Sequence, residues 1–416
     1  MSISKNSNFW KTLGPGILFA TTCIGVSHLV QSTRAGADYG FILLWAIVLA
    51  NIFKYPFFEF TSRYTNATGE SVIDGYLKMG RWILISFGVV TIATMFIVTS
   101  AVTFVTAGLL TNLVPGLHLE TDMWVLIILL ICFAILGLGK FSLLDGLLKV
   151  VGTVLVLSTL TAFVSAMMTG QVPKAEGFVP NDPLGDVGIL FVVALMGWMP
   201  TAVDMSVWTS LWTEERIKQT GYFPKLKETL LDFNLGYIVS AVLACCFLSL
   251  GALIIYGTGT ELSNSSPVFA SQLINMYTST IGEWSFIVIA IAAFSTMFST
   301  SITVMDGYGR TMSRITMLLK GGKEHSRGVF MFWIALIIIG SYIVSTQFVN
   351  SLKSLVDMAT VVSFIIAPFA GYLNYRLIVS KNVPDSHQPP MWLKVLAWSG
   401  LIFLTIFSII YIVKII

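Results

Sequence analysis

Residues 192–213 read VVALMGWMPTAVDMSVWTSLWT, an apolar run long enough to lie in a lipid bilayer but interrupted near its middle. The interruption consists of Gly197 and Pro200, which weaken a helix, and of Asp204, an acid one helical turn after the proline. An ionisable group at membrane depth costs free energy, so it is a candidate functional residue. The stretch therefore predicts a broken membrane helix with a binding site at the break.

The composition of the whole chain is that of an integral membrane protein. Of its 416 residues 56% are hydrophobic and only 11% are charged. The apolar runs are about twenty residues long, which suits α-helices rather than the alternating strands of an outer-membrane barrel. We expect eleven membrane spans, at about residues 13–33, 40–61, 82–112, 123–139, 143–169, 186–210, 232–256, 283–308, 329–348, 355–378 and 392–413.

The basic residues indicate an orientation, because cytoplasmic loops carry an excess of Lys and Arg. Lys54 and Lys149 lie within or at the edge of spans. If the N-terminus is in the cytoplasm, most of the other basic residues also face the cytoplasm. The outer side then holds only Arg34, Lys174, Lys353 and Lys414. This predicts a multi-pass protein with its N-terminus in the cytoplasm and its C-terminus outside, and the chain suits a bacterial inner membrane.

A second interrupted segment lies in span 1, in ILFATTCIGVSHLVQSTRAG (residues 17–36), where Gly25, Ser27, His28 and Gln31 make the middle polar. Spans 1 and 6 are five spans apart. Transporters built from two inverted five-helix repeats place discontinuous helices at corresponding positions, with free backbone groups at the membrane midplane. We therefore predict an all-α membrane transporter with helices 1 and 6 unwound. Its repeats cover about residues 13–170 and 186–378, and an extra helix covers 392–413.

Each intramembrane polar residue also has a plainer interpretation. His28 is compatible with a hydrogen-bonded core histidine, Asp204 with a structural acid paired to a neighbouring span, and Met199 with core packing. Lys54 and Glu59 lie near the predicted cytoplasmic end of span 2, so we expect their side chains to reach the interface. Asp306, at the predicted end of span 8, is likewise expected at the interface.

The chain resembles the NRAMP family of proton-coupled divalent metal transporters over nearly its whole length. The resemblance rests on the order and spacing of GPGILFATTCIG (14–25), RAGADYGFILLWAIVLANIFKY (34–55), NATGES (66–71), GWMPT (197–201), AAFSTMFSTSITVMDGYGRTM (292–312) and SFIIAPFAGY (363–372). It implies a LeuT-like inverted-repeat fold of eleven or twelve spans, a transported divalent metal of the manganese or iron class, and a coupling proton in symport.

The family's ionic groups are largely replaced. Its first-span Asp-Pro-Gly-Asn signature falls on residues 25–28, which read Gly-Val-Ser-His, and its sixth-span Met-Pro-His on residues 199–201, which read Met-Pro-Thr. The third-span acids fall on Met95 and Val98, and the tenth-span glutamine on Ile366. A transition metal normally needs a charged ligand when it leaves water. Standard proton-coupled manganese or iron transport is therefore not expected without a rebuilt site.

The candidate substrate site consists of Gly25, Ser27, His28, Gln31, Trp198, Met199, Thr201 and Asp204. Within it, His28, Met199 and Asp204 are the candidate metal ligands, because an imidazole and a thioether suit a soft ion and Asp204 replaces the lost acid. His28 and Asp204 also form a candidate proton-sensitive pair. We expect no resident cofactor.

Two other functions stay open: a carrier of a small polar organic solute on the same scaffold, and a sensor that does not transport. An enzyme is not expected, because the chain has no nucleophile–base motif, phosphate loop or HExxH metal site. The expected partners are the lipid bilayer and a small-molecule or ion substrate. Neither nucleic acid nor an obligate protein partner is expected.

Overall fold

The computed structural model describes residue 12 and residues 14–139, 141–322, 326–348 and 351–415, with only the backbone given for 141–151 and 348. The regular elements in these ranges are helices. They are α2 (Pro15–Cys23), η1 (Ser27–Ser32), α3 (Thr33–Tyr39), η2 (Gly40–Leu43), α4 (Leu44–Thr68), α5 (Val72–Met79), α6 (Arg81–Leu113), α7 (Thr121–Leu138), α8 (Phe141–Thr169), α9 (Asp186–Gly197), η3 (Val203–Met205), α10 (Ser206–Thr220), α11 (Leu226–Ile254), α12 (Ser266–Ile281), η4 (Glu283–Ser285), α13 (Phe286–Leu319), α14 (Arg327–Ile343), η5 (Val344–Phe348), α15 (Leu352–Ile378), η6 (Asp385–His387) and α16 (Met391–Ile415).

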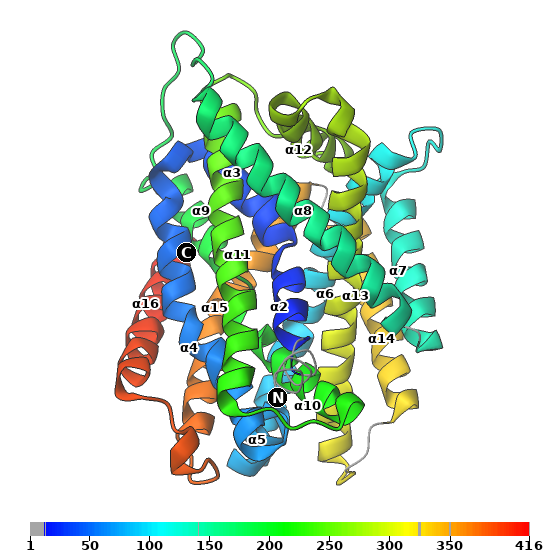
Figure 1. Ribbon diagram of the computed structural model, residues 1–416, viewed down its shortest axis with the longest axis vertical. Helices are drawn as coiled ribbons and strands as arrows, with labels where there is room; N and C mark the ends of the chain where they lie inside the picture. Colours follow the sequence, from blue (N-terminus) through cyan, green and yellow to red (C-terminus); the bar gives the residue numbers. More distant parts are fainter. Residues whose placement is uncertain (1–11, 13, 140, 323–325, 349–350, 416) are drawn as a thin grey trace, which may run out of the picture.

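The long helices form one bundle, which is drawn upright in Figure 1, with α12 at its upper end and α5 at its lower end. Within the described residues, nine helical runs are long and apolar enough to cross a membrane. The first of them, Ser27–Thr68, joins the end of predicted span 1 to span 2, and α9 is too short to qualify alone. The prediction of an all-helical, multi-span membrane protein is confirmed. The finer count of eleven spans in two inverted repeats stays a prediction.

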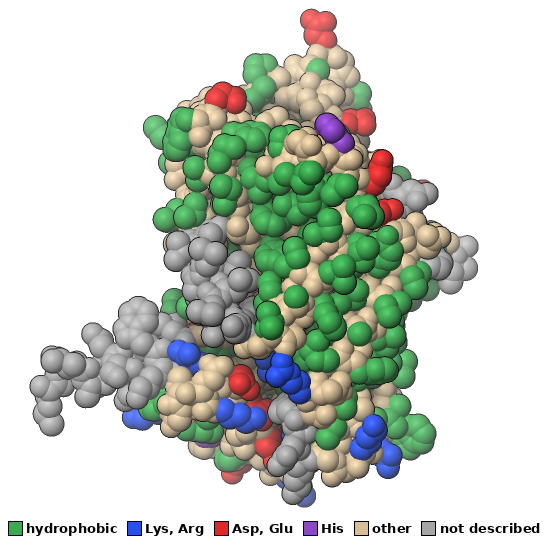
Figure 2. All heavy atoms as spheres, turned by 90° about the vertical axis from the view of Figure 1, so that its right-hand side faces the viewer, with side chains coloured by type: hydrophobic (Ala, Val, Ile, Leu, Met, Phe, Trp, Pro, Cys, Tyr) green, Lys and Arg blue, Asp and Glu red, His purple; other side chains and the backbone are tan. Residues whose placement is uncertain are grey.

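The surface agrees with this assignment. Figure 2 shows one face on which hydrophobic side chains cover the middle of the molecule, while Lys and Arg gather towards the lower end. The acidic side chains of this face lie mainly towards the upper end, with a few near the lower end. Five basic residues used in the orientation argument cannot be placed, since Lys5, Lys11, Lys140 and Lys323 lie outside the described residues and Lys149 has no described side chain. The membrane side of each end stays a prediction.

Two helices run further than the sequence indicated. Helix α4 continues to Thr68 and α13 to Leu319. Lys54, Glu59 and Asp306 are therefore inside long helices and buried, with exposed fractions of 0%, 2% and 6%. The expectation that they reach the interface was wrong, because it placed the helix ends too early.

Close backbone packing holds the first broken helix, α2, against α11. A Cβ atom on Gly16 of α2 would lie 2.0 Å from the carbonyl oxygen of Asp232 on α11, and a Cβ on Gly236 would lie 2.1 Å from the carbonyl oxygen of Gly16. The Asp232 carboxylate also accepts the backbone N–H groups of Gly14 (3.3 Å) and Gly16 (2.7 Å) at the start of α2. An acid at a helix N-terminus satisfies free N–H groups and suits the helix dipole. Helix α2 is thus held to α11 at its first turn.

Candidate functional site

The two predicted breaks exist, and they adjoin. Helix α2 ends at Cys23 and η1 begins at Ser27, while α9 ends at Gly197 and η3 begins at Val203. The Ser27 hydroxyl lies 3.4 Å from the carbonyl oxygen of Pro200, so the backbone of one break is within reach of a side chain from the other. Unwound backbone of this kind is tolerated at membrane depth where protein surrounds it.

A cavity of about 20 Å³ lies between the breaks, which is room for about one water molecule. Three of the predicted site residues, Ser27, Trp198 and Thr201, line it. The other lining residues are Thr22, Val26, Val98, Val102, Met205, Thr300 and Val304. This lining therefore supplies four hydroxyl groups and an indole, and it contains no charged side chain.

His28 is directed to α11. Its Nε2 lies 2.9 Å from the carbonyl oxygen of Ser240, and its Nδ1 lies 2.8 Å from the hydroxyl oxygen of Ser27. A carbonyl oxygen can only accept, so Nε2 carries the proton in this arrangement. The side chain is fully buried and packs edge-on against Phe247. Both ring nitrogens thus have partners within the protein.

The other two candidate metal ligands have different neighbours. The Met199 sulfur accepts a weak hydrogen bond from the Ser32 hydroxyl at 3.8 Å. One oxygen of Asp204 accepts from Thr94 on α6 at 3.2 Å, and its other oxygen, Oδ1, is buried without a hydrogen-bond partner. Within the described residues, no group of three or more His, Cys, Asp or Glu side chains is placed to hold a metal ion. The metal site of His28, Met199 and Asp204 stays a prediction.

Gln31 belongs to a polar cluster that joins the upper part of span 1 to α15. Its amide nitrogen donates to Asp357 at 2.9 Å, and its amide oxygen accepts from Arg34 at 2.9 Å. Arg34 in turn forms an ion pair with Asp357 at 2.7 Å. Gly25 has a different role, because a Cβ there would lie 2.9 Å from a methyl group of Thr300 on α13. These two predicted residues therefore position span 1 against its neighbours.

Lys54 is the residue of this centre that the sequence interpretation missed. Its Nζ atom donates to the carbonyl oxygens of Met196 (2.6 Å), Gly197 (2.8 Å) and Thr201 (3.4 Å), all at the break of span 6. It also lies 6.0 Å from the centre of the Phe364 ring and interacts electrostatically with Asp204. The available signal was the position of a lysine in the apolar run AIVLANIFKYPFF (46–58), far from either end of the helix.

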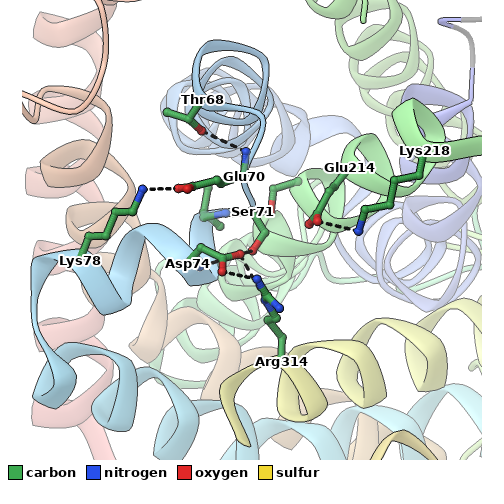
Figure 3. A network of polar contacts seen from close by, with 10 residues as sticks. Thr68, Glu70, Ser71, Asp74, Lys78, Glu214, Lys218 and Arg314 are labelled. Atoms are coloured by element: carbon green, nitrogen blue, oxygen red, sulfur yellow. Dashed lines mark hydrogen bonds and ion pairs between the residues drawn. The ribbon is translucent and has the colours of Figure 1, made fainter. Parts of the chain in front are cut away.

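A second polar network closes the lower end of the bundle. In Figure 3, Arg314 of α13 points to Asp74 of α5 and forms an ion pair with it, while Ser71 bonds to the same carboxylate. Nearby, Lys78 pairs with Glu70 and Lys218 pairs with Glu214 on α10. The network therefore ties the turn between α4 and α5 to α13.

Comparisons with known proteins agree with this architecture. The family model "Natural resistance-associated macrophage protein-like" (Nramp) matches residues 16–414. The uncharacterized protein PM0681 of Pasteurella multocida is 36% identical over 409 residues, which are 97% of this chain and 92% of that protein. The divalent metal cation transporter MntH of Staphylococcus saprophyticus is 22% identical over 439 residues, with 100% of this chain and 95% of that protein covered.

Two kinds of solved structure share the fold. A manganese transporter of Eremococcus coleocola, in complex with an aromatic bis-isothiourea substituted compound, matches with a TM-score of 0.71 at 16% identity, over 100% of this chain and 88% of that chain. MhsT in complex with L-phenylalanine matches with a TM-score of 0.60 at 13% identity, over 96% and 98%. The chain therefore belongs to the Nramp family of membrane transporters, with a LeuT-like fold, and is not an enzyme.

Proposed function

We propose that the protein is a secondary transporter that works by alternating access and carries a small, uncharged polar solute rather than a divalent metal ion. The observation that carries this proposal is the cavity between the two breaks. Its lining contains the hydroxyls of Thr22, Ser27, Thr201 and Thr300 and the Trp198 ring, without a charged side chain. Each hydroxyl already donates a hydrogen bond within the protein, so in this conformation it meets a guest as an acceptor. Hydroxyls on a mostly apolar wall suit a neutral guest that is recognised by hydrogen bonds.

The two polar networks support alternating access. The Arg34–Asp357 pair joins α3 to α15 on one side of the breaks, and the Arg314–Asp74 pair joins α13 to α5 at the lower end. A carrier needs contacts of this kind, which break and form in turn while the centre stays intact. The small cavity suits a closed conformation, in which a larger solute enters only after one network opens.

The electrostatics of the centre oppose a divalent metal. The Lys54 ammonium is buried at the break and is attracted electrostatically by Asp204, although the two groups do not form a direct ion pair. Two unit charges about 4 Å apart interact by roughly 4 kcal/mol at an effective dielectric constant of about 20, so a divalent ion beside Lys54 meets roughly twice that repulsion. Both nitrogens of His28 are also in use.

Transport of a metal ion is the second candidate, and one observation favours it. Oδ1 of Asp204 is a buried carboxylate oxygen without a hydrogen-bond partner, and such an oxygen is a potential cation ligand. The distant MntH relatives carry the name of divalent metal cation transporters. This candidate requires Asp204 to exchange Lys54 for the metal as its counter-ion.

The test combines ligand binding with flux. Purified protein is screened by thermal unfolding with uncharged amides, polyols and zwitterionic amino acids, and uptake of each stabilising compound into proteoliposomes is then measured beside Mn(II) uptake. We expect stabilisation and saturable uptake of an uncharged compound, reduced by Thr201→Val, and neither uptake of zwitterionic amino acids nor Mn(II) uptake above empty liposomes. Thr260→Val, in an exposed loop, is the matched control.

Saturable Mn(II) uptake that is lost in Asp204→Asn would overturn the solute proposal and establish the metal candidate. Stabilisation by a compound that is not taken up would favour the sensor. The two outcomes are distinguishable because the first retains flux and the second does not.

A further inference from the structure

We propose that Lys54 is a resident cation, whose ammonium group fills a cation site made by the break of span 6 and excludes dissolved ions from it. This proposal is separate from the identity of the transported solute, because it concerns a charge that the centre carries permanently. It stands on contacts of Lys54 and does not require that any particular compound is transported.

The site is made of backbone oxygens that a continuous helix would have used internally. In such a helix the N–H of residue 200 would bond to the carbonyl of Met196, but Pro200 has no N–H, and this carbonyl accepts the N–H of Met199 at 3.3 Å while its other lone pair faces Lys54. Gly197 is the last residue of α9, so its carbonyl also lacks a helical partner. The C-terminal end of a helix carries partial negative charge. The break therefore gathers neutral oxygens and a dipole that both favour a positive charge.

The ammonium of Lys54 has as many N–H donors as the site has carbonyl acceptors, and its positive charge suits the partial negative charge of the site. It has three N–H donors, and three carbonyl oxygens lie 2.6, 2.8 and 3.4 Å from Nζ. The side chain is fully buried, and a charge in that position is costly unless it is paired and hydrogen-bonded. Asp204 lies on the same break and attracts the ammonium electrostatically without a direct ion pair, so the three carbonyl hydrogen bonds carry most of the stabilisation. The nearby Phe364 ring adds a weaker cation–π attraction.

This arrangement makes Lys54 a specificity-determining residue. Carbonyl oxygens and a carboxylate are the ligands that hard cations use. With the ammonium in their centre, a dissolved ion must displace a tethered charge that cannot diffuse away. Truncation of Lys54 should therefore convert the break into a site for a free cation, whereas a neutral, unbranched side chain of similar length should fill most of the space without supplying charge.

The experiment uses Lys54→Ala, which removes the atoms corresponding to n-propylammonium, and Lys54→Met, which keeps an unbranched side chain one atom shorter and without the charge. Thermal unfolding of full-length protein is measured with n-propylammonium, potassium, tetramethylammonium or n-propanol. We expect n-propylammonium to recover most of the melting temperature lost in Lys54→Ala, and potassium to recover part of it. Tetramethylammonium, which has no N–H donor, and uncharged n-propanol should recover little. Wild type, Lys54→Met and the exposed-lysine control Lys78→Ala should not respond.

The inference fails if Lys54→Ala folds and n-propanol stabilises it as well as n-propylammonium does, because the site would then need volume and not charge. If Lys54→Ala does not fold, Lys54→Met and Lys54→Met/Asp204→Asn decide. We expect the double variant to be more stable than Lys54→Met, since it removes the unpaired acid. A double variant that is less stable than Lys54→Met would contradict the electrostatic attraction between Lys54 and Asp204. Neither result depends on flux, so a failed transport assay leaves this test intact.

Discussion

Gly197 lies directly against the backbone of Thr360: a Cβ atom at Gly197 would be 2.1 Å from the Thr360 carbonyl oxygen. The last residue of α9 is therefore pressed onto α15, and the neighbouring Trp198 donates its indole N–H to Ser363 of the same helix at 2.8 Å. The break of span 6 has a fixed support on this side. Lys54 approaches the same break from α4.

Substitution of Gly197 by Ala should be strongly destabilising. The added methyl group meets backbone, which cannot rotate away, so we expect the free energy of unfolding to fall by about 3 kcal/mol or more. Thermal unfolding in detergent measures the effect. Gly88→Ala in α6 is the control, because a Cβ there would lie 3.5 Å from Ile315, an ordinary contact, and Ala favours a helix by about 1 kcal/mol. Equal melting temperatures for the two variants would contradict the close packing.

Substitution of Asp357 by Asn should loosen the polar cluster that joins span 1 to α15. The variant loses the ion pair with Arg34, worth about 1 kcal/mol for a partly exposed pair, which corresponds to about a fivefold change in the open population. Labelling of a cysteine at Thr201 by a charged thiol reagent, added from the outer side, should accelerate by a similar factor. Lys414→Gln, which breaks the exposed pair with Asp186, should leave the rate unchanged. A rate equal to that of the parent protein would show that this pair does not limit access.

Substitution of Asp232 by Ala should release the start of α2. The carboxylate accepts the N–H groups of Gly14 and Gly16, and loss of a helix cap costs about 1–2 kcal/mol. We expect a lower melting temperature and faster labelling of the Thr201 cysteine from the cytoplasmic side. Ser351→Ala, which removes an exposed cap of α15, should lower stability less and leave the labelling unchanged. Unchanged labelling in Asp232→Ala would indicate that α2 does not move to open the centre.

Removal of metal ions should leave the wild-type protein unaffected. A ligand that binds only the folded state raises stability with its concentration. Because Lys54 occupies the carbonyls of the break, we expect the same melting temperature in EDTA, in Mn(II) and in Cd(II). A saturable rise with Mn(II) that disappears in Asp204→Asn would contradict this expectation.

The sequence predicted the parts of the fold that depend on apolar length and on helix breakers. Gly25, Gly197 and Pro200 indicated both breaks, because each weakens a helix wherever it lies in the fold. The sequence did not predict α12, because this helix is too amphipathic and too short to resemble a span, and it did not predict the short α5. The extents of α4 and α13 were also missed, since the segments beyond the predicted span ends, 62–68 and 309–319, contain several polar residues that the fold buries.

Lys54 was missing from the predicted site because the end of its helix was placed too early. Ser27, Trp198 and Thr201 line the cavity between the breaks, and their role in binding stays a prediction. Lys54 was assigned to the interface because span 2 was ended at residue 61, which placed the lysine within reach of water. Its true partners are backbone carbonyls more than a hundred residues away in the chain. No residue pattern records such contacts, which depend on how α4 packs against α9.

The centre between the breaks should be reached from both sides of the membrane in turn. Its most direct test is labelling of the Thr201 cysteine by a membrane-impermeant thiol reagent, in right-side-out and in inside-out vesicles, with the parent protein as control for the four native cysteines. The account predicts modification from both sides, with Asp357→Asn increasing the rate from the outside and Asp232→Ala increasing it from the cytoplasm. Modification from one side only, in the parent background and in both variants, would contradict it.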